Sequence, residues 1–189
     1  METRIKDLLT KIKFPEDRFS SFSSAIFEKI VVVESKNTWN IYIKNNTNFY
    51  YDDISIFLEC LNTFVDKKFK YNLYIKTENE DLSLFEEYYK QILILINNNN
   101  LYYNMFCDRL VRENDDFFIE VYNKSEEITI KRKIETINNY FKNYGFKTLP
   151  NIRLNSEKEK IIRQDIEALK KIDNEKLKNI DKLPKLEPL

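Results

Sequence analysis

The stretch FEKIVVVESKNTWNIYIK, residues 27–44, decides the fold of this chain. Its first part, residues 27–34, contains the β-branched run Ile-Val-Val-Val, which favours a strand. Its last part, residues 38–44, alternates between apolar and polar side chains, as a strand with one buried face does. The three residues between these parts are short and polar. The stretch therefore predicts a β-hairpin.

Helical patterns lie on both sides of this hairpin. Apolar residues recur at helical spacing over residues 5–12. Residues 17–25 are rich in Ser and Phe and predict a short second helix. A broad apolar stripe over residues 54–65 predicts a longer helix, which either Asp52 or Asp53 can cap.

Residues 71–75 alternate again and predict a third strand. The first 77 residues then follow the order helix, short helix, strand, strand, helix, strand. This order predicts a small three-stranded sheet with helices packed on one face. Because residues 77–81 are polar and acidic, we expect a first α+β domain over residues 1–77.

Residues 78–155 predict a second α+β domain, with the order helix, strand, helix, strand. Helical patterns cover residues 82–96 and 101–110, and the four asparagines 97–100 are expected to link them. A strand is expected over residues 117–122, after a turn-like acidic segment.

The rest of this segment contains one more helix and one more strand. Ser125 with two following glutamates predicts a helix start, and Gly145 is expected to end that helix in a left-handed conformation. Residues 149–154 predict a short strand, at a sheet edge because of Pro150. Residues 156–189 predict a charged helix and a linker toward a following domain. The fold class is therefore α+β with two small units.

The composition excludes most familiar enzyme machinery. The chain of 189 residues has no histidine, which excludes Ser-His-Asp triads and histidine-ligated metal sites. It has one glycine, which excludes glycine-rich phosphate-binding loops. It has two cysteines, too few for a disulfide scaffold or an all-cysteine zinc site. We therefore expect no catalytic residue, no metal and no cofactor.

The charges and the N-terminus bear on location. The 31 basic and 31 acidic residues cancel to a net charge of zero, so no overall field attracts nucleic acid or a membrane. The charged N-terminus lacks the apolar run of a signal peptide, and no stretch approaches the length of a membrane span. We expect a cytoplasmic protein with two reduced, half-buried thiols at Cys60 and Cys107.

Three acidic pairs are the candidates for a Mg²⁺ site. They are Asp52-Asp53, Asp115-Asp116 and Glu126-Glu127. The first and last stand where helices are expected to begin, where carboxylates are favoured by capping and by the helix dipole. The middle pair falls in a predicted turn. The structural interpretation is the stronger one.

Two basic clusters are the candidates for nucleic-acid binding. The run Lys131-Arg132-Lys133 lies in a predicted helix, where three consecutive residues spread over most of a turn. The second cluster follows a predicted helix and is also explained by the helix dipole. Its members are Lys67, Lys68 and Lys70, together with Lys76. Solvated surface is the alternative for both clusters.

Aromatic residues make up 14 % of the chain, and most fall on faces already assigned to the core. Four tyrosines fall on the less apolar faces and are candidates for a partner surface, where tyrosine is enriched. They are Tyr42, Tyr50, Tyr51 and Tyr74. Trp39 is either a buried anchor on the inner face of the sheet or an interface hot spot.

The residues also resemble a known family. Residues 28–39, EKIVVVESKNTW, look like the paired strands in the N-terminal region of the PolC-type DNA polymerase III alpha subunit of low-GC Gram-positive bacteria. Residues 140–146, YFKNYGF, resemble an aromatic helix end followed by Gly-Phe in the same region. The order of helices and strands extends the resemblance over nearly the whole chain.

The resemblance implies a specific role. In that family, two small units called NI and NII precede the polymerase core and its proofreading 3′–5′ exonuclease. NI is similar to protein-interaction modules of the clamp loader and of the replication initiator. The chain would then be a non-catalytic part of a DNA-directed DNA polymerase. It would bind clamp-loader or helicase-loader components and assist DNA binding. It would bind neither a membrane nor a small-molecule substrate.

A stand-alone nucleic-acid-binding protein is the alternative. The basic run at residues 131–133 and the surplus of tyrosine favour it. Steeply salt-dependent DNA binding by the chain alone would distinguish it from the first interpretation.

Overall fold

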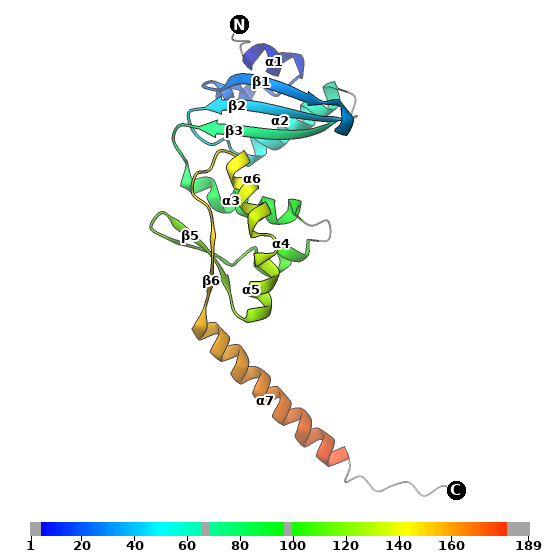
Figure 1. The fold of residues 1–189 in the computed structure, drawn as a ribbon, viewed down its shortest axis with the longest axis vertical. Coiled ribbons are helices and arrows are strands. Elements are labelled where there is room, and N and C mark those ends of the chain that lie inside the picture. Colours follow the sequence, from blue (N-terminus) through cyan, green and yellow to red (C-terminus); the bar gives the residue numbers. More distant parts are fainter. Residues whose placement is uncertain (1–4, 66–68, 97–99, 181–189) are drawn as a thin grey trace, which may run out of the picture.

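The computed structural model describes residues 5–65, 69–96 and 100–180, with side chains described up to residue 173. The N-terminal half contains a short helix, a three-stranded sheet and a longer helix (Figure 1). Its elements are α1 (Ile5–Lys11), the 3-10 segment η1 (Glu16–Phe22), β1 (Ile26–Val33), the 3-10 turn η2 (Glu34–Lys36), β2 (Thr38–Asn45), α2 (Tyr51–Phe64) and β3 (Lys70–Thr77). The predicted order is confirmed.

The N-terminal sheet has the strand order β1-β2-β3. β1 and β2 form the predicted antiparallel hairpin, and Asn37 turns the chain with a positive φ of 46°. β3 returns parallel to β2, with α2 as the crossover helix. In Figure 1, α2 lies behind the sheet, and the opposite face is turned toward the viewer.

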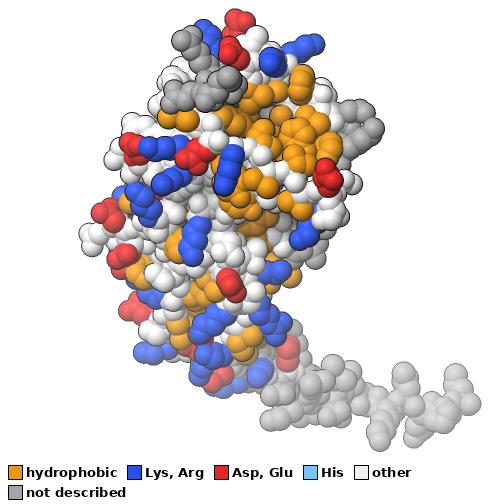
Figure 2. All heavy atoms as spheres, turned by 45° about the horizontal axis from the view of Figure 1, so that its top comes forward, with side chains coloured by type: hydrophobic (Ala, Val, Ile, Leu, Met, Phe, Trp, Pro, Cys, Tyr) orange, Lys and Arg blue, Asp and Glu red, His pale blue; other side chains and the backbone are white. Residues whose placement is uncertain are grey.

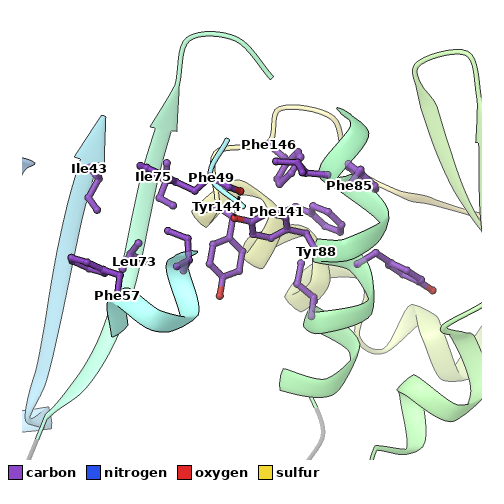
Figure 3. Packing of buried hydrophobic residues seen from close by; sticks show 14 of the residues in the cluster. Ile43, Phe49, Phe57, Leu73, Ile75, Phe85, Tyr88, Phe141, Tyr144 and Phe146 are labelled. Atoms are coloured by element: carbon purple, nitrogen blue, oxygen red, sulfur yellow. Dashed lines mark hydrogen bonds between the residues drawn. The ribbon is translucent and has the colours of Figure 1, made fainter. Parts of the chain in front are cut away.

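The inner face of this sheet packs against α2. Ile41 of β2 is opposite Leu73 of β3, and Ile43 is opposite Ile75. All four side chains are buried, as is Phe57 of α2, and Figure 3 shows Phe57 near Leu73 and Ile43. The period-two pattern of the strands and the helical stripe therefore meet in one apolar layer.

Two details of α2 differ from the sequence prediction. Neither Asp52 nor Asp53 caps the helix, because Tyr50 is the N-cap residue and makes no side-chain capping bond. Asp53 is instead buried and accepts a hydrogen bond of 2.7 Å from Arg18. Phe64, counted in the apolar stripe, is 59 % exposed because it lies in the last turn, beyond the sheet.

The C-terminal half repeats the strand topology of the first. Its sheet has the order β4-β5-β6, with β4 and β5 antiparallel and β5 and β6 parallel. The elements are the 3-10 turn η3 (Leu82–Leu84), α3 (Phe85–Leu95), α4 (Leu101–Phe106), β4 (Leu110–Glu113), β5 (Asp116–Val121), α5 (Lys124–Lys131), α6 (Ile134–Asn143), β6 (Asn151–Leu154) and α7 (Ser156–Ile180).

The sequence predicted these elements with two differences. The helix expected over residues 101–110 ends at Phe106, and β4 follows as an additional strand. The helix expected from Ser125 is divided into α5 and α6, and Asn123 rather than Ser125 is its N-cap. β6 is an edge strand, as Pro150 predicted. The expected linker at residues 97–100 lies largely outside the described residues.

The cores of the two halves are continuous across the junction between β3 and α6. The ring of Tyr51 on α2 meets those of Tyr88 on α3 and of Tyr144 after α6 at centroid distances of 5.4 and 6.1 Å. Figure 3 shows Tyr88 and Tyr144, together with the stacked Phe85 and Phe141, next to buried residues of the N-terminal sheet.

Three buried polar contacts hold the junction. Asn48 donates to the carbonyl of Tyr144 at 3.0 Å, and the Tyr88 hydroxyl donates to the carbonyl of Phe49 at 2.8 Å. The Thr77 hydroxyl donates to the carbonyl of Gly145 at 2.5 Å. Buried polar groups that are satisfied in this way fix the geometry of the surrounding core.

Gly145 ends α6 as the sequence predicted, with a φ of 88°. A Cβ atom at this position would lie 2.6 Å from Cγ2 of Thr77 and 3.2 Å from the carbonyl oxygen of Ile75. The single glycine therefore allows both the left-handed turn and the close approach of α6 to β3.

The remaining features concern α7 and the thiols. α7 extends away from the rest of the molecule (Figure 1), and its Leu169 and Ile172 are exposed. No helix in the described ranges is long and apolar enough to span a membrane. Cys60 and Cys107 are free and half-buried, as predicted.

Candidate interaction surfaces

The three acidic pairs are used within the chain. Asp53 binds Arg18, and Asp115 forms an ion pair of 3.3 Å with Arg112. Glu126 accepts a hydrogen bond from the backbone N–H of Tyr122 at 2.7 Å. Among the residues with described side chains, no group of three or more His, Cys, Asp or Glu residues is placed to hold a metal ion.

Glu127, in the first turn of α5, accepts hydrogen bonds from two lysines. Lys124 donates to it at 2.7 Å and Lys131 donates to it from the other end of the helix. These hydrogen bonds lower the pKa of Glu127 to about 2, so its carboxylate remains charged at neutral pH. The charge of Lys131 is therefore largely compensated inside the chain.

The basic run is consequently not one continuous basic face. Lys131 is the last residue of α5, exposed Arg132 lies in the turn, and Lys133 is the N-cap of α6. In the second predicted cluster, Lys67 and Lys68 lie outside the described residues. Lys70 is described, and it is the exposed first residue of β3.

The outer face of the N-terminal sheet brings two candidate tyrosines together. Tyr42 of β2 is opposite Tyr74 of β3, and their rings stack with centroids 4.8 Å apart and planes 13° apart. The ammonium group of Lys29, on β1, lies over the Tyr42 ring at 4.7 Å from its centroid. One rung of the sheet therefore carries a cation and two stacked rings.

Polar residues flank this rung on both sides. Asn72 donates to Asn40 at 2.9 Å on one side, and Lys44 is opposite Lys76 on the other. We call this surface the tyrosine face, defined by these four residues with Lys29, Tyr42, Lys70 and Tyr74. No helix covers it in the part of the chain that the structure describes (Figure 1).

Positive charge predominates on the tyrosine face. Lys44 forms an ion pair of 2.8 Å with Glu78, which raises the pKa of Lys44. Lys29, Lys70 and Lys76 form no ion pair with any carboxylate of the described chain, and all three are exposed. Part of this surface was predictable, because the alternation of residues 38–44 placed Tyr42 on the polar side of the strand.

A second surface lies along the free edge of β1. β1 pairs with β2 on one side, and no described strand pairs with its other side. Four apolar residues of this strand are between 40 % and 48 % exposed, and we call them the β1 edge: Ile26, Ile30, Val31 and Val32. Figure 2 shows hydrophobic side chains gathered at the end of the molecule that carries α1 and β1.

A pocket adjoins the β1 edge. It has a volume of about 800 Å³ and lies between α1, η1 and β1. Its apolar wall includes Leu9, Phe19 and Ile26, and its polar lining includes Lys6 and Glu16. Because Ile26 belongs to both features, the pocket and the β1 edge are one continuous surface.

The remaining aromatic candidates lie elsewhere. Trp39 is half-buried on the inner face, against Phe69 and Tyr71, so it is an anchor of the sheet. Tyr51 is part of the junction, where its ring meets Tyr88 at a centroid distance of 5.4 Å. Tyr50 is 61 % exposed at the start of α2.

The outer face of the C-terminal sheet has a different chemistry. Arg153 donates to Glu113 at 2.7 Å and to Glu120 at 2.9 Å, and its guanidinium lies over the ring of Phe118. Arg109 lies over the ring of Tyr122 at 3.3 Å from its centroid. The sequence prediction did not find this network, because it pairs residues 33 and 40 positions apart.

The fold is α+β with two three-stranded sheets, and its N-terminal sheet has an apolar strand edge and a bare polar-aromatic face. Residues 4–78 match the family described as DNA polymerase III polC-type N-terminus I. Residues 4–78 are thus similar to that family, as the resemblance of residues 28–39 predicted. Comparisons with curated proteins and with solved structures give no match.

Proposed function

We propose that the chain is the non-catalytic N-terminal region of a PolC-type DNA polymerase III alpha subunit and that it docks other replisome proteins. Residues 1–77 are its NI domain, residues 78–155 an NII-like domain, and residues 156–189 lead toward a following domain. The catalytic polymerase and exonuclease activities belong to other parts of the parent protein, in the cytoplasm. The partners are components of the clamp loader or of the helicase loader.

One observation carries the docking role, the unpaired and apolar β1 edge within the part of the chain that matches the family. An edge strand offers a row of free backbone N–H and C=O groups. A partner can add a strand there through main-chain hydrogen bonds, and pockets for its side chains supply specificity. The pocket that begins at Ile26 suits this mode of binding.

The alternative of a stand-alone nucleic-acid-binding protein has less support. The run at residues 131–133 is divided by a helix break, and Lys131 is paired with Glu127. The family match is to a polymerase region. An auxiliary contribution to DNA binding remains part of the proposal.

The docking role is tested with the full chain and purified clamp-loader and helicase-loader proteins. Isothermal titration calorimetry compares the wild type with the double variant Ile30→Lys/Val32→Lys. Lysines on an edge strand oppose the addition of another strand. We expect the wild type to bind one of these proteins and the double variant to bind at least tenfold more weakly.

A matched control is Ile128→Lys, because Ile128 of α5 is 46 % exposed, close to the 48 % of Val32. This control should bind like the wild type. Equal affinity of the edge variant and the wild type would refute the role of the β1 edge. The absence of binding to every clamp-loader and helicase-loader protein would refute the docking function.

A further inference from the structure

We propose that the tyrosine face of the N-terminal sheet is a binding site for single-stranded nucleic acid. The bases would stack on the Tyr42–Tyr74 pair, and the surrounding lysines would contact the phosphates. The site uses residues other than those of the β1 edge, so this proposal and the docking role can be tested independently.

The first argument for this site is the stacking geometry of its aromatic rings. Tyr42 has the Lys29 ammonium over its ring and also stacks against Tyr74. Tyr74 stands on β3, an edge strand of the sheet, and in the described chain its only ring partner is Tyr42. A base that stacks on Tyr74 would therefore extend an existing column of cation and rings. Stacking of bases on exposed aromatic side chains is the main sequence-tolerant interaction of single-strand binders.

The second argument is the unpaired positive charge of the lysines on this face. Lys29, Lys70 and Lys76 are exposed at different rungs of the face, and the described residues offer none of them an ion-pair partner. A chain with zero net charge thus leaves local positive charge next to the half-buried rings of Tyr42 and Tyr74. A phosphate backbone that crosses the sheet beside the stacked bases would meet these lysines and release counterions.

Hydrogen bonding is the third step. Asn40 and Asn72 lie next to the stacked rung and are joined by one hydrogen bond between their side chains. That bond uses one donor of Asn72 and the oxygen of Asn40, so each amide retains capacity for base edges or phosphates. A single strand exposes such edges, whereas a duplex hides both its base faces and its pairing edges.

The composition of the face favours nucleic acid over a protein partner. The outward positions at three successive rungs of β2 and β3 are Asn40 with Asn72, Tyr42 with Tyr74, and Lys44 with Lys76. None of them has an aliphatic side chain. On β1, the outward residue opposite Asn40 is Val31, which is 40 % exposed. Protein interfaces are depleted of lysine relative to the rest of the surface, whereas this face carries four lysines around its central tyrosine pair.

Fluorescence anisotropy of a labelled 20-nucleotide oligo(dT) with the full chain tests the proposal. The variants Tyr74→Ala and Lys29→Gln/Lys76→Gln are compared with matched controls elsewhere on the surface. The exposed Tyr50→Ala controls for loss of a tyrosine, and Lys158→Gln/Lys170→Gln, at two exposed positions of α7, controls for loss of two positive charges. Circular dichroism establishes that each variant is folded, and Tyr74→Phe preserves the ring if Tyr74→Ala does not fold.

We expect the wild type to bind oligo(dT) with a Kd between about 1 and 100 µM at 50 mM salt, and more weakly at 200 mM salt. Tyr74→Ala should weaken binding about fivefold or more, while Tyr74→Phe stays close to the wild type. The Lys29→Gln/Lys76→Gln variant should lower the slope of log Kd against log salt by about 1.4. The two controls should change the affinity less than about twofold.

Several results would overturn the proposal. One is the absence of oligo(dT) binding at 50 mM salt, and another is equal affinity for a duplex. A third is an equal loss of affinity in Tyr74→Ala and Tyr50→Ala, which would show that the rings do not act at this face. A Tyr74→Ala variant that loses only the replisome protein would assign the face to protein docking.

Discussion

The two sheets of the chain share one topology, but the charged side chains on their outer faces differ in whether they form ion pairs. In each sheet an antiparallel hairpin is followed by helix and a third strand parallel to the second. On the C-terminal sheet, Arg153 is bound by Glu113 and Glu120. On the N-terminal sheet, Lys29 lies over a tyrosine ring and no carboxylate of the described chain pairs with it.

This difference separates a surface whose charges pair within the chain from one whose charges are mostly unpaired. The arginine network satisfies its charges within the chain and joins all three strands β4, β5 and β6. On the tyrosine face, Lys44 pairs with Glu78, whereas Lys29, Lys70 and Lys76 pair with no carboxylate of the described residues. Topology alone therefore does not indicate function, and the side chains that alternate outward decide it.

The largest effect is expected in the buried aromatic cluster of the C-terminal half. Phe85→Ala removes a fully buried ring that stacks on Phe117 at 3.8 Å and on Phe141 at 4.2 Å. Loss of such a ring should lower the free energy of unfolding by about 3–5 kcal/mol. Urea denaturation monitored by circular dichroism measures this change. Phe64→Ala is the control, and because Phe64 is mostly exposed its effect should stay within about 0.5 kcal/mol.

The second effect concerns the glycine at the junction. Gly145→Ala places a Cβ atom against Thr77 and forces an alanine into a positive φ. We expect a loss of about 2 kcal/mol in the free energy of unfolding, measured in the same denaturation experiment. Asn37→Gly is the reciprocal control, because glycine adopts the positive φ of Asn37 without strain and should leave stability within about 1 kcal/mol. A neutral Gly145→Ala would contradict the close approach of α6 to β3.

The third effect compares the two outer faces directly. Arg153→Gln leaves Glu120 without its arginine partner, and we expect a loss of about 1 kcal/mol because the pair is partly screened by solvent. Lys76→Gln removes a charge that has no described ion pair, and stability should change by less than about 0.5 kcal/mol. Thermal melts of both variants provide the comparison. Equal losses would remove the distinction between a structural and a binding face.

The sequence predicted local structure where one dominant signal was present. The hairpin followed from β-branched residues and alternation, and the end of α6 followed from Gly145. β4 was missed because residues 110–113 continue a run of apolar and charged residues that also fits a helix. The break between α5 and α6 was missed because Ile130, Ile134 and Ile137 keep helical spacing across it.

The surfaces were predictable in part. Alternation in residues 38–44 placed Tyr42 outward, but the stack with Tyr74 depends on the register between two parallel strands. That register is set by α2 and by the packing of the inner face, which local patterns do not encode. Tyr51 was predicted as a surface residue, yet it lies half-buried in the junction, because α6 approaches from about 90 residues along the chain.

The smallest effect is a pH dependence that should belong to the C-terminal face alone. Hydrogen bonds from Asn155 and Arg153 lower the pKa of Glu120 below its ordinary value of 4.5 in the folded chain. A carboxyl group whose pKa is lower when folded contributes stability above its unfolded pKa. That contribution is lost as the pH falls below about 4.5 and through the folded pKa. Denaturation at pH 7 and at pH 3 should therefore show a smaller difference in Glu120→Gln than in the wild type. Lys76→Gln should leave the difference unchanged, because it removes no carboxylate from the C-terminal face. If Glu120→Gln retained the full pH dependence of the wild type, the carboxylate on the C-terminal face would not be stabilising the sheet.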